Sequence, residues 1–153
     1  MKKIVSKFFE LSKNVVSQYG KENVIIVAAG TEGLKIGTLL AYALGCLYTY
    51  YIPEYLEKSE QDISIECENK HIIIVTDAIA TGDTVDEIIN KCKIQVSMIK
   101  NILSIFGREI KDNESWKYEK IAVYLNTSFQ LDVIKQEECQ IKQAYGKCIC
   151  IDM

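Results

Sequence analysis

The sequence contains little of several residue types that would point to particular classes of protein. It has one proline, one histidine and a formal net charge of −3 over 153 residues. A general nucleic-acid-binding protein usually carries a basic excess, so we do not expect nucleic acid as a partner. No apolar stretch of about 20 residues is present, so we expect no membrane-spanning helix.

The six cysteines do not predict a metal centre. Three of them stand alone among apolar or mixed neighbours, where buried free thiols are typical: Cys46, Cys67 and Cys92. The others lie closer together near the C-terminus: Cys139, Cys148 and Cys150. The Cys-x-x-Cys pairs of common zinc sites are missing, and the single histidine, His71, is distant in sequence. We therefore expect no metal ion held by the protein alone.

The N-terminal segment predicts an amphipathic helix rather than a signal peptide. Its apolar residues recur at helical spacing: Ile4, Phe8, Leu11 and Val15. Polar residues interrupt the continuous apolar core that a signal peptide needs. A cytoplasmic location is therefore the expectation, and structural disulfides are not expected.

Length and composition predict one domain over residues 1–153, because 48% of the residues are hydrophobic and 25% are charged. Short aliphatic runs alternate with segments of helical periodicity, which favours an α/β fold with a parallel, twisted sheet flanked by helices. The expected helices span Lys3–Gln18, Leu34–Leu44 and Val85–Lys91. The expected strands span Val24–Val27, Leu47–Tyr51, Ile72–Val75, Val96–Phe106 and Ile121–Leu125, with a weaker one over Ile63–Glu66.

The most informative stretch is HIIIVTDAIATGDT, residues 71–84. Its four aliphatic residues predict a buried, parallel strand. The turn that follows contains hydroxyl groups and a glycine, and it opens a helix. Unpaired backbone N–H groups and the positive end of the helix dipole make such a turn a site for phosphate. A carboxylate stands beside it at Asp77, where it suits sugar hydroxyls.

A second unit of the same kind precedes it. The strand over Val24–Val27 is followed by a turn of small residues, Ala28–Gly33, and by an Ala/Leu-rich helix that stops at Gly45. Glycine in the turn allows backbone to approach a ligand closely. In a parallel sheet, both turns should lie outside the carboxyl ends of the strands, where ligands bind.

In this order, the two units resemble type I phosphoribosyltransferases, which use phosphoribosyl pyrophosphate (PRPP). The spacing of Gly33, Gly37 and Leu44-Gly45 is similar to adenine phosphoribosyltransferases in particular. The resemblance implies a PRPP motif made of Thr76, Asp77, Ala80, Thr81, Gly82, Asp83 and Thr84, with Asp77 as the catalytic candidate. It implies a pyrophosphate loop made of Ala29, Gly30, Thr31, Glu32 and Gly33, with Lys35 one helical turn downstream.

Two positions depart from the family pattern. Thr76 stands where the family has the first of two acidic residues, and Glu32 stands where a basic residue is common. Two unit charges about 4 Å apart interact by about 4 kcal/mol at an effective dielectric constant near 20, so a carboxylate facing pyrophosphate would be unfavourable. Glu32 must therefore point away or be offset by Mg²⁺, and Lys35 could supply the missing positive charge.

The resemblance implies transfer of a phosphoribosyl group to a nucleobase, with a purine favoured, with Mg²⁺ bound to the substrate and with a homodimer as the assembly. It also implies that Pro53–Asn69 closes over the reacting centre, although an exposed connector would have the same composition. A small hood, with Arg108 and residues 121–130, would contact the base. Two other interpretations remain open. One is a regulator of the same fold that binds PRPP or a nucleotide without turnover. The other is an unrelated α/β binding protein.

Overall fold

The computed structural model describes residues 1–52, 67, 69–108 and 118–127, which form a parallel sheet with helices on both faces. The strands are β1 (Val24–Ala29), β2 (Leu47–Tyr51), β3 (His71–Ile79), β4 (Ile99–Arg108) and β5 (Ile121–Thr127). The α-helices are α1 (Lys2–Tyr19), α2 (Thr31–Leu44) and α3 (Asp83–Lys91). Short 3₁₀ helices span Lys21–Asn23 and Val96–Met98. The strand order is β2-β1-β3-β4-β5, and every neighbouring pair is parallel.

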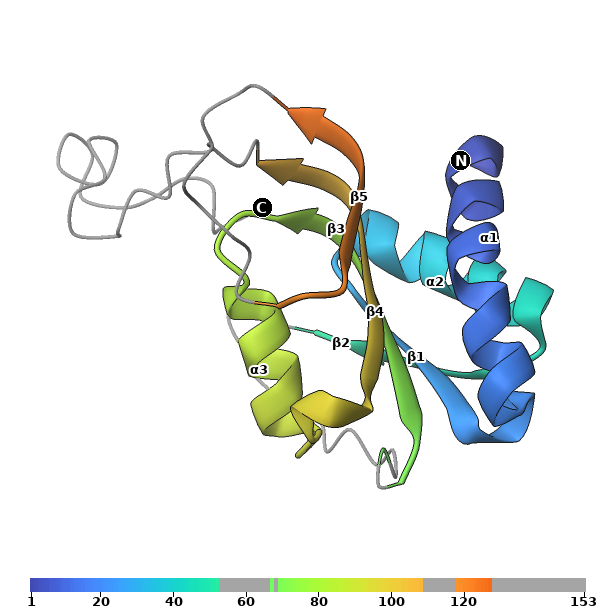
Figure 1. Cartoon of the computed structure of the whole chain (residues 1–153). Helices are drawn as coiled ribbons and strands as arrows, with labels where there is room; N and C mark the ends of the chain where they lie inside the picture. The colour runs from blue at the N-terminus through green and yellow to red at the C-terminus, as the bar shows by residue number, and fades with distance from the viewer. Residues whose placement is uncertain (53–66, 68, 109–117, 128–153) are drawn as a thin grey trace, which may run out of the picture.

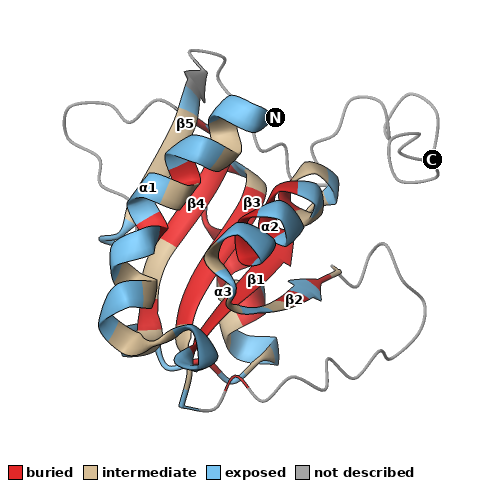
Figure 2. Cartoon of the chain, turned by 90° about the vertical axis from the view of Figure 1, so that its right-hand side faces the viewer, coloured by how far each residue is buried: buried red, intermediate tan, exposed pale blue. Residues whose placement is uncertain are grey.

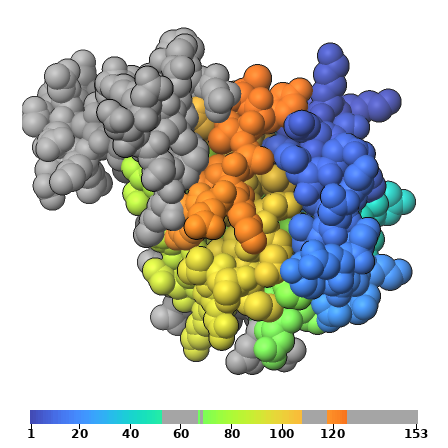
Figure 3. Space-filling model, viewed as in Figure 1, coloured from blue at the N-terminus to red at the C-terminus, as the bar shows by residue number. Residues whose placement is uncertain are grey.

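The helices form two layers around the sheet (Figure 1). Helices α1 and α2 cover one face, where Phe8, Ile36 and Leu40 pack against Ile26 and Ile73. Their outward surfaces are exposed while the strands behind them are buried (Figure 2). The space-filling view shows α1 and the surface of β5 on the same side of the molecule (Figure 3).

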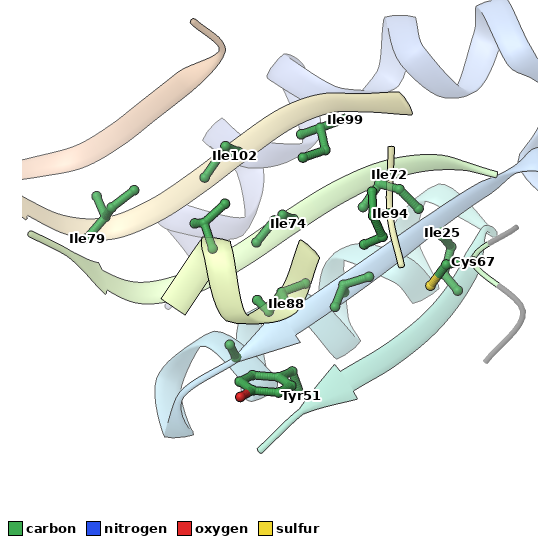
Figure 4. Packing of buried hydrophobic residues seen from close by; sticks show 13 residues of the cluster. Ile25, Tyr51, Cys67, Ile72, Ile74, Ile79, Ile88, Ile94, Ile99 and Ile102 are labelled. Atoms are coloured by element: carbon green, nitrogen blue, oxygen red, sulfur yellow. The ribbon is translucent and has the colours of Figure 1, made fainter. Parts of the chain in front are cut away.

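Helix α3 covers the other face of the sheet (Figure 4). Val85 and Ile88 of α3 pack into a cluster with Ile74 and Ile102 of the central strands, and with Tyr51 from the end of β2. All six residues of β1 are buried, because helices lie on both of its faces. This explains the continuous aliphatic run, since a strand covered on one side only would alternate apolar with polar residues.

Most expected elements are present, with different boundaries. Strand β2 matches the expected residues, and α1 is one residue longer at each end. Helix α2 begins three residues earlier than predicted, at Thr31, so Glu32 and Gly33 belong to its first turn rather than to a loop. Strand β3 continues to Ile79, so Thr76 and Asp77 lie inside the strand. The strand predicted from Val96 begins only at Ile99.

The weak strand predicted over Ile63–Glu66 lies outside the described residues. The same holds for most of the predicted closing loop over Pro53–Asn69. Within the described residues, no helix has the length and apolar character needed to cross a membrane.

Candidate functional site

The parallel register places the ends of β1 and β3 beside each other. Ala29 of β1 is aligned with Thr76 of β3, so the residues that follow them, Gly30 and Asp77, lie side by side at the carboxyl edge of the sheet. The turn that opens α3 follows β3 at the same edge, from Ala80 to Gly82. The prediction that both turns share one edge of the sheet is therefore confirmed.

Gly30 and Asp77 are in close contact. A Cβ atom added to Gly30 would lie 2.2 Å from Oδ2 of Asp77, so the carboxylate would have to move to admit a side chain there. Gly30 also has φ 75° and ψ 157°, a conformation that residues with a Cβ atom rarely adopt. The carboxylate of Asp77 thus occupies the space above Gly30, the N-cap residue of α2. A negative charge at this position is favoured by the positive end of the α2 dipole.

Gly33 allows the first turn of α2 to lie against the β3 backbone. A Cβ atom at Gly33 would lie 3.0 Å from the backbone nitrogen of Asp77 and 3.0 Å from Cα of Thr76. We expected small residues in this turn to admit a ligand. In the structure Gly30 and Gly33 also have a packing role, because the absence of side chains lets the start of α2 lie directly against β3.

The two residues at the family's acidic positions have different environments. Thr76 is 2% exposed, and its hydroxyl donates to the backbone oxygen of Ala78 at 3.2 Å, so this side chain is turned into the protein. Asp77 is half-buried, and its Oδ1 accepts a hydrogen bond from the backbone nitrogen of Ala78 at 2.8 Å. That bond fixes the orientation of the carboxylate at the sheet edge.

The turn from Ala80 to Gly82 presents the start of α3 at the surface. Thr81 and Asp83 are exposed, and the Thr81 hydroxyl accepts from the Asp83 backbone nitrogen at 3.3 Å. Gly82 is the N-cap residue, with φ 99°, and it has no side chain of its own to cap the helix. Asp83 and Thr84 are ordinary N-cap residue types, but here they are the first helical residues, and Gly82 is the N-cap, with a positive φ that glycine adopts readily.

Glu32 and Lys35 form an exposed ion pair on the first turn of α2. The Nζ atom of Lys35 lies 2.6 Å from Oε1 of Glu32. The unfavourable carboxylate is therefore offset by a charge from its own helix. In this arrangement the ammonium of Lys35 is engaged with Glu32.

Sequence reasoning missed two tyrosines that contact α3. The Tyr118 hydroxyl donates a hydrogen bond to the Asp86 carboxylate, and its ring lies against Gly82. Burial, and then the hydrogen bond to Asp86, raise the pKa of Tyr118 to about 12. On the other side of α3, the Tyr51 hydroxyl donates to Oε2 of Glu87 at 2.9 Å. Tyr118 stands in a polar segment with no periodicity, so no pattern in the sequence marks it.

Comparison with solved structures identifies the architecture. A hypoxanthine-guanine-xanthine phosphoribosyltransferase superposes with a TM-score of 0.55 at 18% identity, covering 80% of this chain and 74% of that protein. A hypoxanthine-guanine phosphoribosyltransferase from Bacillus anthracis gives 0.57 at 15% identity, with 84% and 80% covered. A purine phosphoribosyltransferase from Pyrococcus horikoshii gives 0.50 at 18% identity, with 80% and 89% covered. The chain has the type I phosphoribosyltransferase fold.

The sequence itself matches no known family model and no curated protein. The fold is thus established by structure, while the roles of individual residues remain predictions. Of the hood residues predicted for this fold, Arg108 ends β4 and the segment from 121 to 127 forms β5, while residues 128–130 lie outside the described part.

One cavity lies elsewhere on the phosphoribosyltransferase fold, between α1 and α2. Its volume is about 370 Å³, and its walls are largely apolar, with Val5, Phe9 and Leu39 among the lining residues. None of the predicted site residues lines it. Because the polar groups gather at the carboxyl edge of the sheet, we place the candidate site there.

Proposed function

We propose that this protein transfers the phosphoribosyl group of PRPP to a purine base and releases pyrophosphate. One observation carries the proposal. The half-buried carboxylate of Asp77 lies over the N-cap of α2, and the turn that opens α3 follows Asp77 closely along the chain at the same edge of the sheet. This arrangement suits a sugar that carries an anionic group on each side. The purine phosphoribosyltransferase neighbours support the same class of reaction.

The 5′-phosphate would bind at the start of α3. The first amides of a helix have no acceptor within the helix, so those of Asp83 and Thr84 can donate to phosphate oxygens, the Asp83 amide by exchanging its present bond to the Thr81 hydroxyl. Thr81 and Asp83 are exposed at this turn, which leaves it open to a ligand. The Thr81 hydroxyl would add a donor of its own, exchanging its present bond with the Asp83 amide.

Asp77 would hold the ribose. Its carboxylate accepts a hydrogen bond from the Ala78 amide at 2.8 Å and lies over the N-cap of α2, where it can also accept hydrogen bonds from sugar hydroxyls. In the reaction, a ring nitrogen of the base bonds to the anomeric carbon as the bond from that carbon to pyrophosphate breaks. Holding the ribose in line between the attacking base and the departing pyrophosphate would supply much of the rate enhancement.

Pyrophosphate would leave at the start of α2, near Gly30 and Lys35. Mg²⁺ commonly binds one or two carboxylates together with phosphate oxygens, and Asp77 supplies one carboxylate here. We propose that such an ion would arrive bound to the substrate. When bound, this ion would offset the negative charge of pyrophosphate.

The base, the location and the assembly belong to the proposal as well. The neighbours named for hypoxanthine and guanine favour a purine, and the α2 segment similar to adenine phosphoribosyltransferases keeps adenine among the candidates. A base hood that includes Arg108, a cytoplasmic location and a homodimer remain predictions.

A second candidate is a regulator that binds PRPP or a nucleotide without turnover. Two observations favour it. The residue at the family's first acidic position, Thr76, is buried, and Lys35 is paired with Glu32 rather than free for pyrophosphate. PRPP would then still bind, but the departing pyrophosphate would meet too little positive charge for transfer to occur.

Incubation with PRPP, Mg²⁺ and a panel of purines, followed by pyrophosphate release, separates the candidates. Release with one base supports the transferase. Binding of PRPP by calorimetry without release with any base supports the regulator. Binding of neither PRPP nor nucleoside monophosphates would reject both. Asp77→Asn should weaken PRPP binding about tenfold through its ribose contacts. Gly82→Val should abolish binding, because it places a branched side chain at φ 99° in the turn.

A further inference from the structure

Tyr118 reaches the start of α3 from the chain that leads into β5. Its ring lies beside Gly82, since a Cβ atom added there would stand 3.7 Å from Cε2 of Tyr118. Its hydroxyl donates to Oδ1 of Asp86, one turn along the helix. A single side chain therefore contacts both the N-cap residue and an acidic side chain of the first turn. Tyr118 also belongs to the edge of the core beneath α3.

The acidic residues on α3 pose an electrostatic problem for an anionic ligand. Asp83 and Asp86 lie in the first turn, and Glu87 follows. Each carboxylate stabilises the helix start, but each also repels a phosphate that would use the same positive end of the dipole. A ligand can bind there if these carboxylates are held to the side of the helix and the amides remain exposed.

Tyrosine hydroxyls hold two of the three carboxylates. Tyr118 binds Asp86 on the side of β5, and Tyr51 binds Glu87 on the side of β2. The two hydrogen bonds thus reach α3 from two different strands' ends, and the ring of Tyr118 also lies beside Gly82. The pair formed by Tyr118 and Asp86 is therefore the one that lies nearest to the turn.

We propose that Tyr118 is a positioning residue for the phosphate-binding turn. Its hydroxyl keeps the Asp86 carboxylate at the side of α3, and its ring supports Gly82, so that the first amides face an anionic ligand. This inference rests on the proposed function, because it assigns Tyr118 to the 5′-phosphate site of the same reaction. It concerns binding of the phosphate and leaves the chemical step to other groups.

The test is a double-mutant cycle read by calorimetry with ribose 5-phosphate. Tyr118→Phe keeps the ring and removes the hydroxyl, so the Asp86 carboxylate loses this donor and repels the phosphate. We expect affinity to fall roughly tenfold. In the Asp86→Asn background, where the charge is absent, we expect Tyr118→Phe to change affinity less than about twofold.

Tyr51→Phe is the matched control. It also removes a tyrosine hydroxyl from a carboxylate of α3, but Glu87 lies beyond the first-turn acidic residues. We expect it to change affinity less than Tyr118→Phe does, with a similar decrease in stability to urea. A purely structural role for Tyr118 predicts instead that both variants lose affinity in proportion to stability.

The possible failures can be told apart. If the wild-type protein binds ribose 5-phosphate and Tyr118→Phe binds it equally well, this inference is wrong and the proposed function stands. If Tyr118→Phe weakens binding as much in the Asp86→Asn background as in the wild type, charge positioning is rejected. If the wild-type protein does not bind the ligand, the proposed function and this inference both fail.

Discussion

Replacing Gly30 with alanine tests the contact around which the candidate site is built. The added Cβ atom would lie 2.2 Å from Oδ2 and 2.3 Å from Cγ of Asp77, so the carboxylate must move. Its hydrogen bond from the Ala78 amide would then be lost or weakened. The substitution therefore acts on the backbone and on the orientation of Asp77 together.

The size of the effect follows from these two contributions. A residue with a Cβ atom at φ 75° and ψ 157° costs about 1–3 kcal/mol. Loss of the solvent-exposed hydrogen bond to Asp77 costs about 0.5–1.5 kcal/mol more. We therefore expect Gly30→Ala to lower the free energy of unfolding by roughly 1.5–4.5 kcal/mol.

Gly45 offers a matched control, because it also has a positive φ, of 67°. A Cβ atom there would meet only Cδ of Lys21, at 3.9 Å, so Gly45→Ala carries the backbone cost of about 1–2 kcal/mol without a clash. The gain from restricting the unfolded chain is common to both variants. Urea unfolding should show Gly30→Ala to be less stable than Gly45→Ala by about 0.5–2.5 kcal/mol.

A third variant locates the cause. Asp77→Ala combined with Gly30→Ala removes the clashing carboxylate, so the added cost of Gly30→Ala should shrink toward the backbone cost alone. Equal stability of the Gly30→Ala and Gly45→Ala variants would refute the close contact between Gly30 and Asp77.

Three further predictions concern charge and packing. Burial, and then the charge of Lys100, lower the pKa of His71 in the folded protein. The stability that His71 contributes is therefore present above about pH 6.5 and is lost as the pH falls through its lower folded pKa. Urea unfolding at pH 7.5 and at pH 5 should show a larger loss of unfolding free energy for the wild type than for His71→Gln. Ile88→Ala should lower the free energy of unfolding by about 2–5 kcal/mol, because Ile88 lies on the side of α3 that packs against the sheet and is fully buried. A decrease below about 1 kcal/mol would contradict this packing. Glu32→Gln should leave stability within about 1 kcal/mol and tighten pyrophosphate binding measured by calorimetry, since it releases Lys35 from an exposed ion pair; weaker binding would show that Glu32 does not oppose the ligand.

The sheet could be predicted from the sequence because its central strands are unusually plain signals. The aliphatic runs in β1 and β3 are buried on both faces, and such runs are rare outside parallel sheets. The turn residues between them and the following helices placed both candidate loops at the carboxyl edge. The contact between Gly30 and Asp77 followed only from the register, which a sequence does not show.

Helix starts were harder to predict than strands. Gly33 usually argues against a helix interior, so α2 was expected to begin after it. In the structure Gly33 is required inside the first turn, because any side chain there would meet the β3 backbone. Asp83 is a residue type that is common at N-caps, while the N-cap residue in the structure is Gly82. In both cases a tertiary contact or a positive φ decided a position that local preference would assign differently.

The tyrosines around α3 show what sequence patterns leave out. Tyr118 and Asp86 are 32 residues apart, and neither stands in a recognisable motif. Their meeting depends on β5 returning to the sheet beside β4, on the side that α3 covers. Contacts of this kind arise from topology, so they became visible only when the strand order was known.

The central claim is that the amides at the start of α3 bind the phosphate of a sugar phosphate. The most direct measurement is a titration of ¹⁵N-labelled protein with ribose 5-phosphate, following the amide resonances of the turn. The account predicts saturable shifts that are largest from Thr81 to Thr84, and their loss in Gly82→Val. Shifts confined to other parts of the chain, or none at concentrations that saturate calorimetric binding, would contradict it.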